Sequence, residues 1–454
     1  MLKKWLHKVL PGKSSRGKPR ARKEIIPFSE HRISADQLSF AAEKVIRRLY
    51  NEGYEAYVVG GAVRDLLLGI EPKDFDVATN ATPEQVRKVF RRSRIIGRRF
   101  QIVHVMIGPE TIEVTTFRGG GKVQQNEHGR IMKDNTYGSI EEDAMRRDFT
   151  CNALYYDPIR QQIIDFHHGV SDVRARKLVM IGNPAERYQE DPVRVLRAVR
   201  LSGKLGFEVE RNTAEPISAF AGRLKQEPVA RLFDEIMKLL FSGHAGQCLQ
   251  QMNTLGISGK IHPLLNALQH TENGGQNIVS LALHNTDERL RADKSVSVGF
   301  VLAAVLWPQL NTYWQRNMSQ GQKPVLALNN AIGDLRDDVE KGWGVPQRFA
   351  ATMREIWQLQ PQFDNRKGAR PHRLLAQQRF RAAYDFLLLR GEAGEVDGEL
   401  VQWWTKFQHA DDETRMQMTA VQQKRGGETS GDKTKRKRRR KPKPKVENSG
   451  GHAG

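Results

Sequence analysis

The stretch AYVVGGAVRDLLLGIEPKDFDV, which runs from Ala56 to Val77, decides the fold of this chain. It starts as a strand-like apolar run, breaks at Gly60-Gly61, continues as a helical pattern over residues 62–68, and then becomes extended again. Paired glycines after a strand let backbone N–H groups approach a phosphate closely, and the helix that follows turns its positive end toward the same anion. The stretch therefore predicts a phosphate-binding turn between a strand and a helix.

Three charged residues of this stretch add to that prediction. Arg64 lies in the first turn of the expected helix, where a guanidinium could bind a triphosphate bidentately. Asp74 and Asp76 are spaced i, i+2, so on a strand both carboxylates would point to one face. A divalent cation would relieve their repulsion, and Mg²⁺ prefers such oxygen ligands. Each feature alone is more often a plain turn or a solvated strand edge, but the two together in this order favour a nucleotide and metal site.

Charge is concentrated at the two ends of the chain. The sequence has 454 residues, enough for two to four domains, and a formal net charge of +21. Residues 1–23 hold nine Lys and Arg, residues 433–445 hold ten, and neither segment contains an acidic residue. This pattern predicts arms that bind nucleic acid, with solubility as the plainer alternative. The residues expected to bind RNA are Arg436, Lys437, Arg438, Arg439 and Arg440.

Cysteine use and hydropathy indicate a cytoplasmic protein. The chain has only two cysteines, without metal-type spacing and without a recognisable secretory signal, which is typical of a reducing compartment. The longest apolar run, Val298–Trp307, is too short to cross a membrane and predicts a buried helix. Residues 2–10 (LKKWLHKVL) place apolar side chains on one helical face and lysines on the other. That segment is either a peripheral contact with an anionic membrane or a disordered start.

The segment before the glycine turn predicts a helix that begins at Ser34-Ala35-Asp36, with Ser34 or Asp36 as its cap, and ends at Gly53. After the turn, the strand expected over Thr111–Phe117 alternates in polarity. Glu113 lies in mid-strand, where glutamate is disfavoured. It is either a third carboxylate beside Asp74 and Asp76 or a plain edge residue, and the first interpretation is the favoured one.

Three further segments between residues 91 and 207 are rich in arginine or glycine. Five arginines in residues 91–99 surround two short apolar strands, Ile95–Ile96 and Ile102–Ile107, and form either a solvated edge or a surface for nucleotide or RNA backbone. The polar, glycine-rich residues 119–138 predict a long loop. The segment Glu190–Phe207 predicts one helix with two acids and Pro192 at its start and three arginines along one ridge. Those arginines are Arg194, Arg197 and Arg200.

Four motifs in this order and spacing resemble the class II nucleotidyltransferases, which comprise the bacterial poly(A) polymerases and the tRNA CCA-adding enzymes. The motifs are VVGGAVRDLLLG, KDFDVATNATPEQV, RRDFTCNAL and EDPVRVLRAVRLSGKLGF, and the resemblance covers roughly residues 40–260. It implies an α+β protein: a mixed-sheet nucleotidyltransferase head, an all-helical neck and body, and disordered basic tails. The expected division is a basic arm at 1–26, a catalytic head at 27–165, a neck with an RNA-binding region at 166–260, a helical body at 261–420 and a Lys/Arg-rich tail at 421–454.

The resemblance also implies roles for particular residues. Asp74 and Asp76 would hold two Mg²⁺ ions, with Mn²⁺ as the alternative, and Glu113 would be the third carboxylate. The triphosphate of ATP would contact Gly60, Gly61 and Arg64. Ribose and phosphate would contact Arg147 and Asp148, the latter counted among the catalytic residues. The incoming base would be recognised by Glu190, Asp191, Arg194 and Arg197.

Within this family, three features favour poly(A) polymerase. The segment IIGRRFQIVHV resembles the polymerase version, no His-Asp dipeptide of a hydrolase domain occurs, and the basic C-terminal tail resembles that of proteobacterial poly(A) polymerases. The expected activity is template-independent transfer of AMP from ATP to RNA 3′ ends in RNA processing and decay, with RNA-decay factors as partners. The alternatives are a CCA-adding enzyme and, more remotely, a silent RNA-binding protein. One departure is Ser202-Gly203, where the family often has Phe and Ala.

Overall fold

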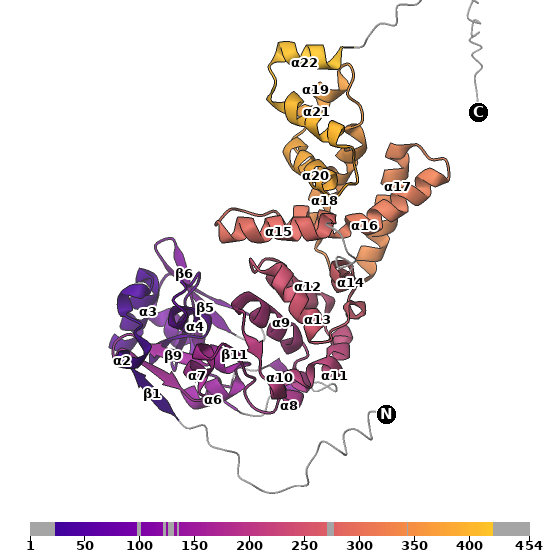
Figure 1. Cartoon of the computed structure of the whole chain (residues 1–454). Helices are drawn as coiled ribbons and strands as arrows, with labels where there is room; N and C mark the ends of the chain where they lie inside the picture. Colours follow the sequence, from indigo (N-terminus) through magenta and orange to yellow (C-terminus); the bar gives the residue numbers. More distant parts are fainter. Residues whose placement is uncertain are drawn as a thin grey trace, which may run out of the picture.

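The structure is a computed structural model in which a mixed-sheet head, a helical neck and a helical body follow one another along one elongated molecule (Figure 1). It describes residues 23–97, 101–120, 124–125, 131–133, 136–269, 277–342 and 344–420. The expected RNA-binding residues 436–440, the C-terminal tail and the N-terminal basic helix lie outside these described residues. The α+β architecture expected from the sequence is confirmed.

The head is built on an eight-stranded sheet in which only β3 and β6 pair in parallel. In spatial order its strands are β1 (Glu24–Pro27), β10 (Gln162–Asp165), β9 (Leu154–Asp157), β2 (Ala56–Val59), β3 (Asp76–Thr79), β6 (Glu110–Thr116), β5 (Ile102–Ile107) and β4 (Ser93–Ile96). Alternation along β6 follows the sequence expectation, because Ile112 and Val114 are buried while Glu113 is exposed.

The two faces of this sheet are covered differently. Helices α3 (Phe40–Asn51) and α5 (Pro83–Val89) pack on the face that carries Val77, Val103 and Val114. On the opposite face, α6 (Ile140–Arg146) packs over β2, β9 and β10, in a separate cluster with Tyr57 and Ile164. On that face, the side chains of β4, β5 and β6 are half-buried or exposed. This second face of the sheet is therefore only partly covered by α6.

The helix expected from Ser34 begins later than predicted. Ser34 instead caps a short 3₁₀ turn, Ala35–Gln37, in a reciprocal arrangement with Gln37. The α-helix starts at Phe40 because Ser39 accepts a hydrogen bond from the Ala42 N–H at 3.1 Å. Two serines five residues apart both satisfy the rules for a helix cap, and the sequence pattern did not distinguish them.

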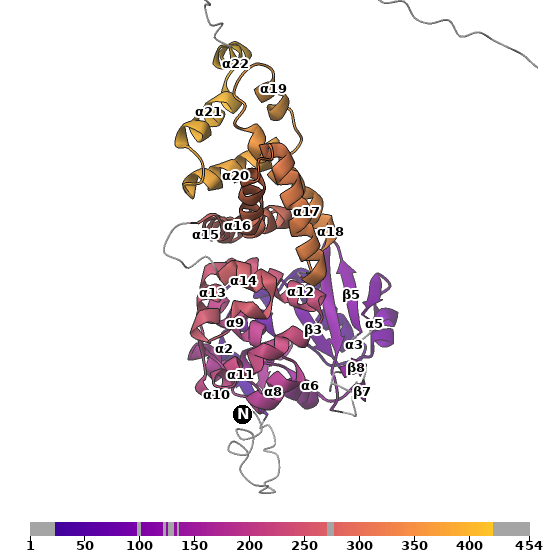
Figure 2. The same ribbon diagram turned by 90° about the vertical axis from the view of Figure 1, so that its right-hand side faces the viewer.

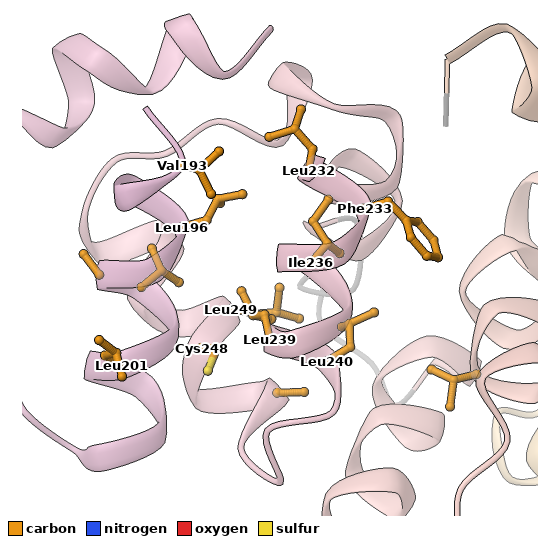
Figure 3. Close-up of a cluster of buried hydrophobic side chains, with 14 of the residues drawn as sticks. Val193, Leu196, Leu201, Leu232, Phe233, Ile236, Leu239, Leu240, Cys248 and Leu249 are labelled. Carbon is orange, nitrogen blue, oxygen red and sulfur yellow. The ribbon is translucent and has the colours of Figure 1, made fainter. Parts of the chain in front are cut away.

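The neck joins the head to the body through a three-helix core. Helix α9 (Arg194–Leu205) packs against α12 (Val229–Leu240) and α13 (Ala245–Thr254), and Figure 3 shows Leu196, Ile236 and Leu249 meeting between them. The prediction of one helix from Glu190 is wrong at its start. Glu190 is the last residue of α8 (Pro184–Glu190), and Asp191 is the extended residue that ends that helix. The two acids therefore lie at the end of α8, before α9 begins.

The departure at Ser202-Gly203 has a packing reason. A Cβ on Gly203 would lie 2.6 Å from Cys248 Cα and 2.7 Å from Cys248 N, so α9 and α13 touch through backbone at this point. Ser202 is buried, and its hydroxyl donates to Val199 O at 3.1 Å. Glycine at 203 permits the close approach of the two helices.

The body consists of helices throughout. Its elements are α14 (Pro263–Gln269), α15 (Ile278–Arg291), α16 (Val298–Ser319), α17 (Pro324–Gly342), α18 (Gln347–Leu359), α19 (Arg370–Leu375), α20 (Phe380–Glu392), α21 (Gly398–His409) and α22 (Asp412–Thr419). As expected, Val298–Trp307 is a buried helical segment. Trp357 and Trp404 are buried in the body, where the indole N–H of Trp357 donates to Ala303 O and that of Trp404 to Phe363 O. No helix in the described part of the chain is both long and apolar enough to span a membrane.

Shorter elements complete the chain. They are α2 (Phe28–His31), α4 (Gly61–Leu67), α7 (Gly169–Arg174), α10 (Arg211–Ala214), α11 (Ile217–Ala221), and the paired short strands β7 (Gln124–Gln125) with β8 (Ile131–Lys133) and β11 (Lys177–Leu178) with β12 (Glu208–Val209). The β7–β8 pair lies within residues 119–138, for which the sequence predicts only a loop. The division into arm, head, neck, body and tail remains a prediction.

Candidate active site

The glycine turn connects β2 to α4 and has a backbone that favours glycine. Gly60 has φ +76° and ψ −125°, and a Cβ there would lie 3.5 Å from Arg147 Nη1. A Cβ on Gly61 would lie 3.4 Å from Arg64 Nη2. Two guanidinium groups therefore lie directly beside the turn, and the positive φ at Gly60 is what favours glycine there.

Arg64 supports the turn from within the head. Its side chain is only 5% exposed, and its Nη1 donates to Asn152 Oδ1 at 2.6 Å while its Nε donates to Asp65 Oδ1 at 2.8 Å. The sequence predicts that Arg64 reaches a triphosphate. The structure places it at the wall of the cavity described below, with these donors already engaged within the protein.

Two of the three predicted carboxylates face each other across neighbouring strands. Asp76 is the first residue of β3 and lies in parallel register with Glu113 of β6. Asp74 does not share the strand with Asp76, contrary to the prediction, because β2 ends at Val59, the residue opposite Asp76. Asp74 therefore lies in the connection before β3.

Asp76 is the most perturbed carboxyl of this group. Its pKa is raised to about 6, mainly by burial and also by the negative charges of Glu113 and Asp74, while Arg147 opposes the shift. Glu113 Oε1 lies 3.3 Å from His104 Nε2. Crowded carboxylate oxygens are the donors that a hard divalent cation prefers, so these residues fit such an ion. Within the described part of the chain, however, no three His, Cys, Asp or Glu side chains gather closely enough to form a complete metal cluster.

Arg147 is fixed by a small buried network below the turn. Its Nη2 donates to Asp143 Oδ2 at 3.0 Å and its Nη1 to Asn152 O at 3.2 Å. The Tyr155 hydroxyl accepts from Arg147 Nε at 3.0 Å and donates to Asp143 Oδ2 at 2.6 Å. Burial opposes the charged form, but the electrostatic and hydrogen-bond contributions of Tyr155 and Asp143 together raise the pKa of Arg147. The guanidinium therefore remains a fixed positive charge beside Gly60.

Asp148 links the head to the neck. Its Oδ2 accepts a hydrogen bond from Arg197 Nε of α9 at 2.7 Å, and its Oδ1 accepts from the Phe149 N–H at 2.9 Å. Burial alone would raise the pKa of this carboxyl, but the charge and hydrogen bond of Arg197 outweigh burial and lower it. Asp148 is therefore ionised and holds the ridge of α9 at a fixed position against the head.

The two acids at the end of α8 make different contacts. Asp191 Oδ2 accepts from Arg231 Nη2 of α12 at 2.7 Å, and this hydrogen bond and charge lower the pKa of Asp191 against the effect of burial. Glu190 pairs with Arg187 at 2.8 Å and with Arg194 at 3.2 Å on the surface. Asp191 faces the cavity, whereas Glu190 lies outside its lining.

A cavity of about 750 Å³ between head and neck brings most of the predicted residues together. Ten Lys and Arg side chains and seven carboxylates line it, so its wall is positive overall, which suits a polyphosphate. Of the predicted site residues in the described part of the chain, Asp74 and Glu190 are outside the lining. Those within it are Gly60, Gly61, Arg64, Asp76, Glu113, Arg147, Asp148, Asp191, Arg194 and Arg197.

Sequence reasoning missed one wall of this cavity. Arg231, Asp234, Glu235 and Lys238 of α12 line it together with Asp76 of β3 and Ile102 of β5, and these three elements lie near one another in the view of Figure 2. Glu235 is buried and accepts from Arg200 Nε at 2.8 Å. The signal was present as four charged residues at helical spacing, which by itself only indicates a solvated helix face.

Three family models match the chain. The model "Poly A polymerase head domain" matches residues 56–179, "Probable RNA and SrmB- binding site of polymerase A" matches residues 206–268, and "Polymerase A arginine-rich C-terminus" matches residues 320–444. Together they match parts of the head, the neck and the body.

Curated relatives agree with these models. Poly(A) polymerase I of Escherichia coli O6:H1 is 45% identical over 399 residues, which are 85% of each chain, and that of Haemophilus influenzae is 39% identical over 88% of this chain and 92% of its own. The CCA-adding enzyme of Oceanobacillus iheyensis is 36% identical over only 48% of this chain and 54% of its own. The preference for poly(A) polymerase over the CCA-adding activity is therefore confirmed.

Solved structures show the same architecture. The Bacillus stearothermophilus CCA-adding enzyme in complex with CTP is similar with a TM-score of 0.55 and 25% identity, covering 83% of this chain and 82% of its own. A tRNA nucleotidyltransferase complexed with a primer tRNA and an incoming ATP analog has a TM-score of 0.51 at 21% identity, covering 80% of this chain and 96% of its own. From its motifs, its fold and its curated relatives, the chain belongs to the poly(A) polymerases, the polynucleotide adenylyltransferases of the nucleotidyltransferase superfamily.

Proposed function

We propose that AMP transfer from ATP to an RNA 3′-hydroxyl takes place in the cavity between head and neck, with Asp74, Asp76 and Glu113 as the divalent-cation site. The observation that carries this is the direct opposition of Asp76 and Glu113 beside the glycine turn, within a positively lined cavity. A pair of Mg²⁺ ions, with Mn²⁺ as the alternative, would supply activation of the 3′-hydroxyl and charge neutralisation on the leaving pyrophosphate.

The protein's own residues bind and orient ATP in this proposal. The fixed guanidinium of Arg147 and the backbone of Gly60 and Gly61 face the triphosphate. Asp148 orients Arg197, and Arg231 orients Asp191, so the adenine meets an acid and an arginine whose positions are already set. Charged groups held in place in this way stabilise a transition state most strongly at the atoms where charge develops. Glu190 contributes by orienting Arg194, with which it forms an ion pair.

We further propose that this activity serves RNA processing and decay in the cytoplasm, with RNA 3′ ends as acceptors and RNA-decay factors as partners. Cys151 and Cys248 are both free and buried, which fits a reducing compartment.

The first test is primer extension with Mg²⁺ on an unstructured oligo(A) and on a tRNA that lacks its CCA end. Each RNA is offered ATP alone, CTP alone, and both. A long ladder on oligo(A) with ATP alone is the expected result. Addition confined to the tRNA and ending after three nucleotides would contradict the proposal.

The second test concerns the carboxylates. The variant Asp76→Asn should retain RNA binding and lose elongation by roughly a thousandfold, the equivalent of several kcal/mol of transition-state stabilisation. The matched control is Asp412→Asn, whose side chain is 92% exposed on α22 and far along the chain from the cavity. Near-wild-type elongation by Asp76→Asn would remove Asp76 from the cation site.

A further inference from the structure

Helix α6 covers only part of the catalytic face of the sheet, where it packs in one cluster with side chains of β2, β3, β9 and β10. Six side chains on β4, β5 and β6 lie beyond α6 on the same face, and all are half-buried or exposed. We call this surface the open half of the sheet; it comprises Arg94, Ile96, Ile102, His104, Met106 and Glu113.

Strand register assigns these side chains to the catalytic face. Glu113 pairs with Asp76 on one side and with His104 on the other, and His104 pairs with Arg94. Directly opposed residues of neighbouring strands point to the same face. Their neighbours Ile95 and Val103 pack on the other face, against the main core. Asp76, Glu113, His104 and Arg94 therefore form one row across four strands, starting at the catalytic carboxylates.

The order of the strands gives this row a direction. The glycine turn follows β2, the carboxylates lie on β3 and β6, and the open half continues through β5 to β4. In phosphoryl transfer, the attacking and leaving oxygens lie roughly in line on opposite sides of the phosphorus. If the triphosphate lies at the glycine turn, the attacking RNA end must approach from the side of β6 and β5. Arg94 lies two strands from Glu113, roughly 10 Å away, within reach of the nucleotides just before the 3′ end.

The chemistry of the open half suits single-stranded RNA. Arg94 is exposed and makes no ion pair with any described residue, and Arg91 and Arg92 precede it, also exposed. Beside these cations, Ile96 is 44% exposed. Unpaired arginines attract phosphates, and apolar side chains can lie against base faces of any sequence. Ile102 and Glu113 also line the catalytic cavity, so the surface is continuous with it.

We propose that the open half of the sheet binds the terminal nucleotides of the RNA that is being extended, with Arg94 on the backbone and Ile96 against a base. This inference rests on the proposed function, because it takes the 3′ end to the carboxylates of that site. It adds the path by which the acceptor strand reaches them and names Arg94 and Ile96 as positioning residues. The surface is open along the strand, so it selects single-stranded RNA and is indifferent to its sequence.

A cross-linking experiment tests the path directly. Both native cysteines are buried, so Ile96→Cys introduces an accessible thiol into a chain that otherwise offers none. An oligo(A) that carries a thiol tether on the nucleotide next to its 3′ end should form a disulfide with this variant. The control is Arg87→Cys on α5, exposed on the opposite side of the sheet. Equal cross-linking of both variants, or none at position 96, would overturn the proposal.

Kinetics test the role of the charge. For Arg94→Glu we expect the KM for oligo(A) to rise roughly tenfold and the KM for ATP to move less than about twofold, since one phosphate contact becomes a repulsion. Arg94→Ala should reduce the slope of log binding constant against log salt by about 0.7. Arg87→Glu is the matched control and should change neither KM.

The outcomes separate this inference from the proposed function. If Asp76→Asn abolishes elongation but Arg94→Glu leaves the KM for RNA unchanged, the cation site stands and the open half is not the RNA path. A protein bound to that surface would then be the simplest occupant. If oligo(A) is not extended at all, yet Ile96→Cys still cross-links to it, the RNA path stands and the assigned chemistry fails.

Discussion

The backbone conformation of Gly60 sets the shape of the glycine turn that we propose binds the triphosphate. Its φ of +76° with ψ −125° is a region that residues with a side chain rarely adopt, and Arg147 Nη1 would lie 3.5 Å from a new Cβ. We expect Gly60→Ala to cost about 1–3 kcal/mol in backbone strain. It should also lower kcat/KM for ATP at least tenfold, because a strained turn would no longer hold its backbone N–H groups in place for the triphosphate of the proposed site.

Gly53 provides the matched control for this prediction. It also has a positive φ, +85°, but a Cβ at this position would meet no atom within 4 Å. Gly53→Ala should lose comparable stability and keep kcat/KM for ATP. For both variants, urea unfolding measures stability, and steady-state kinetics measure kcat/KM at a temperature where each variant is folded. Equal activity in the two variants would show that the turn has no special role.

His262 should make stability depend on pH. It is 3% exposed, its Nδ1 accepts from the Leu264 N–H, and its Nε2 has no partner among the described residues. Burial lowers its pKa to about 4 from 6.5. The unfolded chain therefore binds the proton more readily between pH 6.5 and 4, so stability falls as pH falls through this window.

The expected size of this effect is about 2 kcal/mol between pH 7 and pH 5. Denaturant unfolding at the two pH values measures it, and His262→Gln should remove this part of the difference while losing stability at pH 7. A wild-type free energy of unfolding with the same pH dependence as that of His262→Gln would contradict the assignment.

At the residue scale, the sequence predicted which side chains gather but not how each is used. Glu113 was selected because glutamate is unusual in mid-strand, and the structure places it opposite Asp76. Asp74 was expected on the same strand, but whether a residue pairs depends on where the partner strand ends. Arg64 was expected to contact a triphosphate, and only the three-dimensional structure shows that Asn152, far along the chain, accepts its hydrogen bond.

The contact between α9 and α13 is the element-scale feature most sensitive to one atom. In Gly203→Ala, the added methyl would lie within 2.8 Å of backbone atoms of Cys248, which cannot move cheaply. We expect a loss of about 1–3 kcal/mol, as for overpacked cores. Thermal unfolding measures it as a lower Tm.

Gly333 is the control, since it also lies inside a helix, α17, and a Cβ there would meet no atom within 4 Å. Gly333→Ala should instead raise stability by roughly 0.5–1 kcal/mol, because alanine is the better helix former. If both substitutions stabilised the protein, the close approach at Gly203 would be refuted.

At the element scale, the alternating strand and the helices with clear apolar stripes could be predicted. Helix boundaries at Ser34 and Glu190 could not, because several nearby residues are acceptable caps and end points. The charged face of α12 was not recognised as a cavity wall. That role depends on a head lying opposite it, and the hydrophobic pattern of α12 carries no information about which surface its polar side faces.

At the scale of the whole molecule, we propose that the basic tail supplies long-range attraction for RNA. Deleting residues 424–454 removes the ten Lys and Arg of residues 433–445. RNA binding should weaken, and its salt dependence should flatten by up to about 0.7 in slope for each phosphate that the tail no longer neutralises. AMP addition to a short, saturating primer should persist, because the catalytic cavity is intact.

A tail of equal length with these Lys and Arg replaced by Gln should behave like the deletion, since the effect depends on charge. Salt titration of oligo(A) binding measures the slope for all three proteins. An unchanged slope in the truncated protein would show that the tail does not bind RNA.

The arrangement of head, neck and body could be predicted only through the resemblance. The apolar run Val298–Trp307 indicated a buried helix, yet it did not indicate which other helices pack against it. The buried polar link at Trp307, whose indole N–H donates to Glu395 at 2.6 Å, joins residues 88 positions apart in the chain. Such long-range pairs are determined by packing and leave no local pattern.

The parallel pairing of β3 and β6 also bears on how the chain can change over time. Asp76 and Glu113 are brought together by strand register, and the chain returns to the start of β6 through residues 80–109. Insertions and deletions in the turns of that connection should therefore leave the two carboxylates opposed. A single residue inserted between Glu110 and Glu113 would instead turn the carboxylate toward the hydrophobic face. Related enzymes should therefore vary in length within the connection that corresponds to residues 80–109. They should keep the same number of residues between the positions of Glu110 and Glu113.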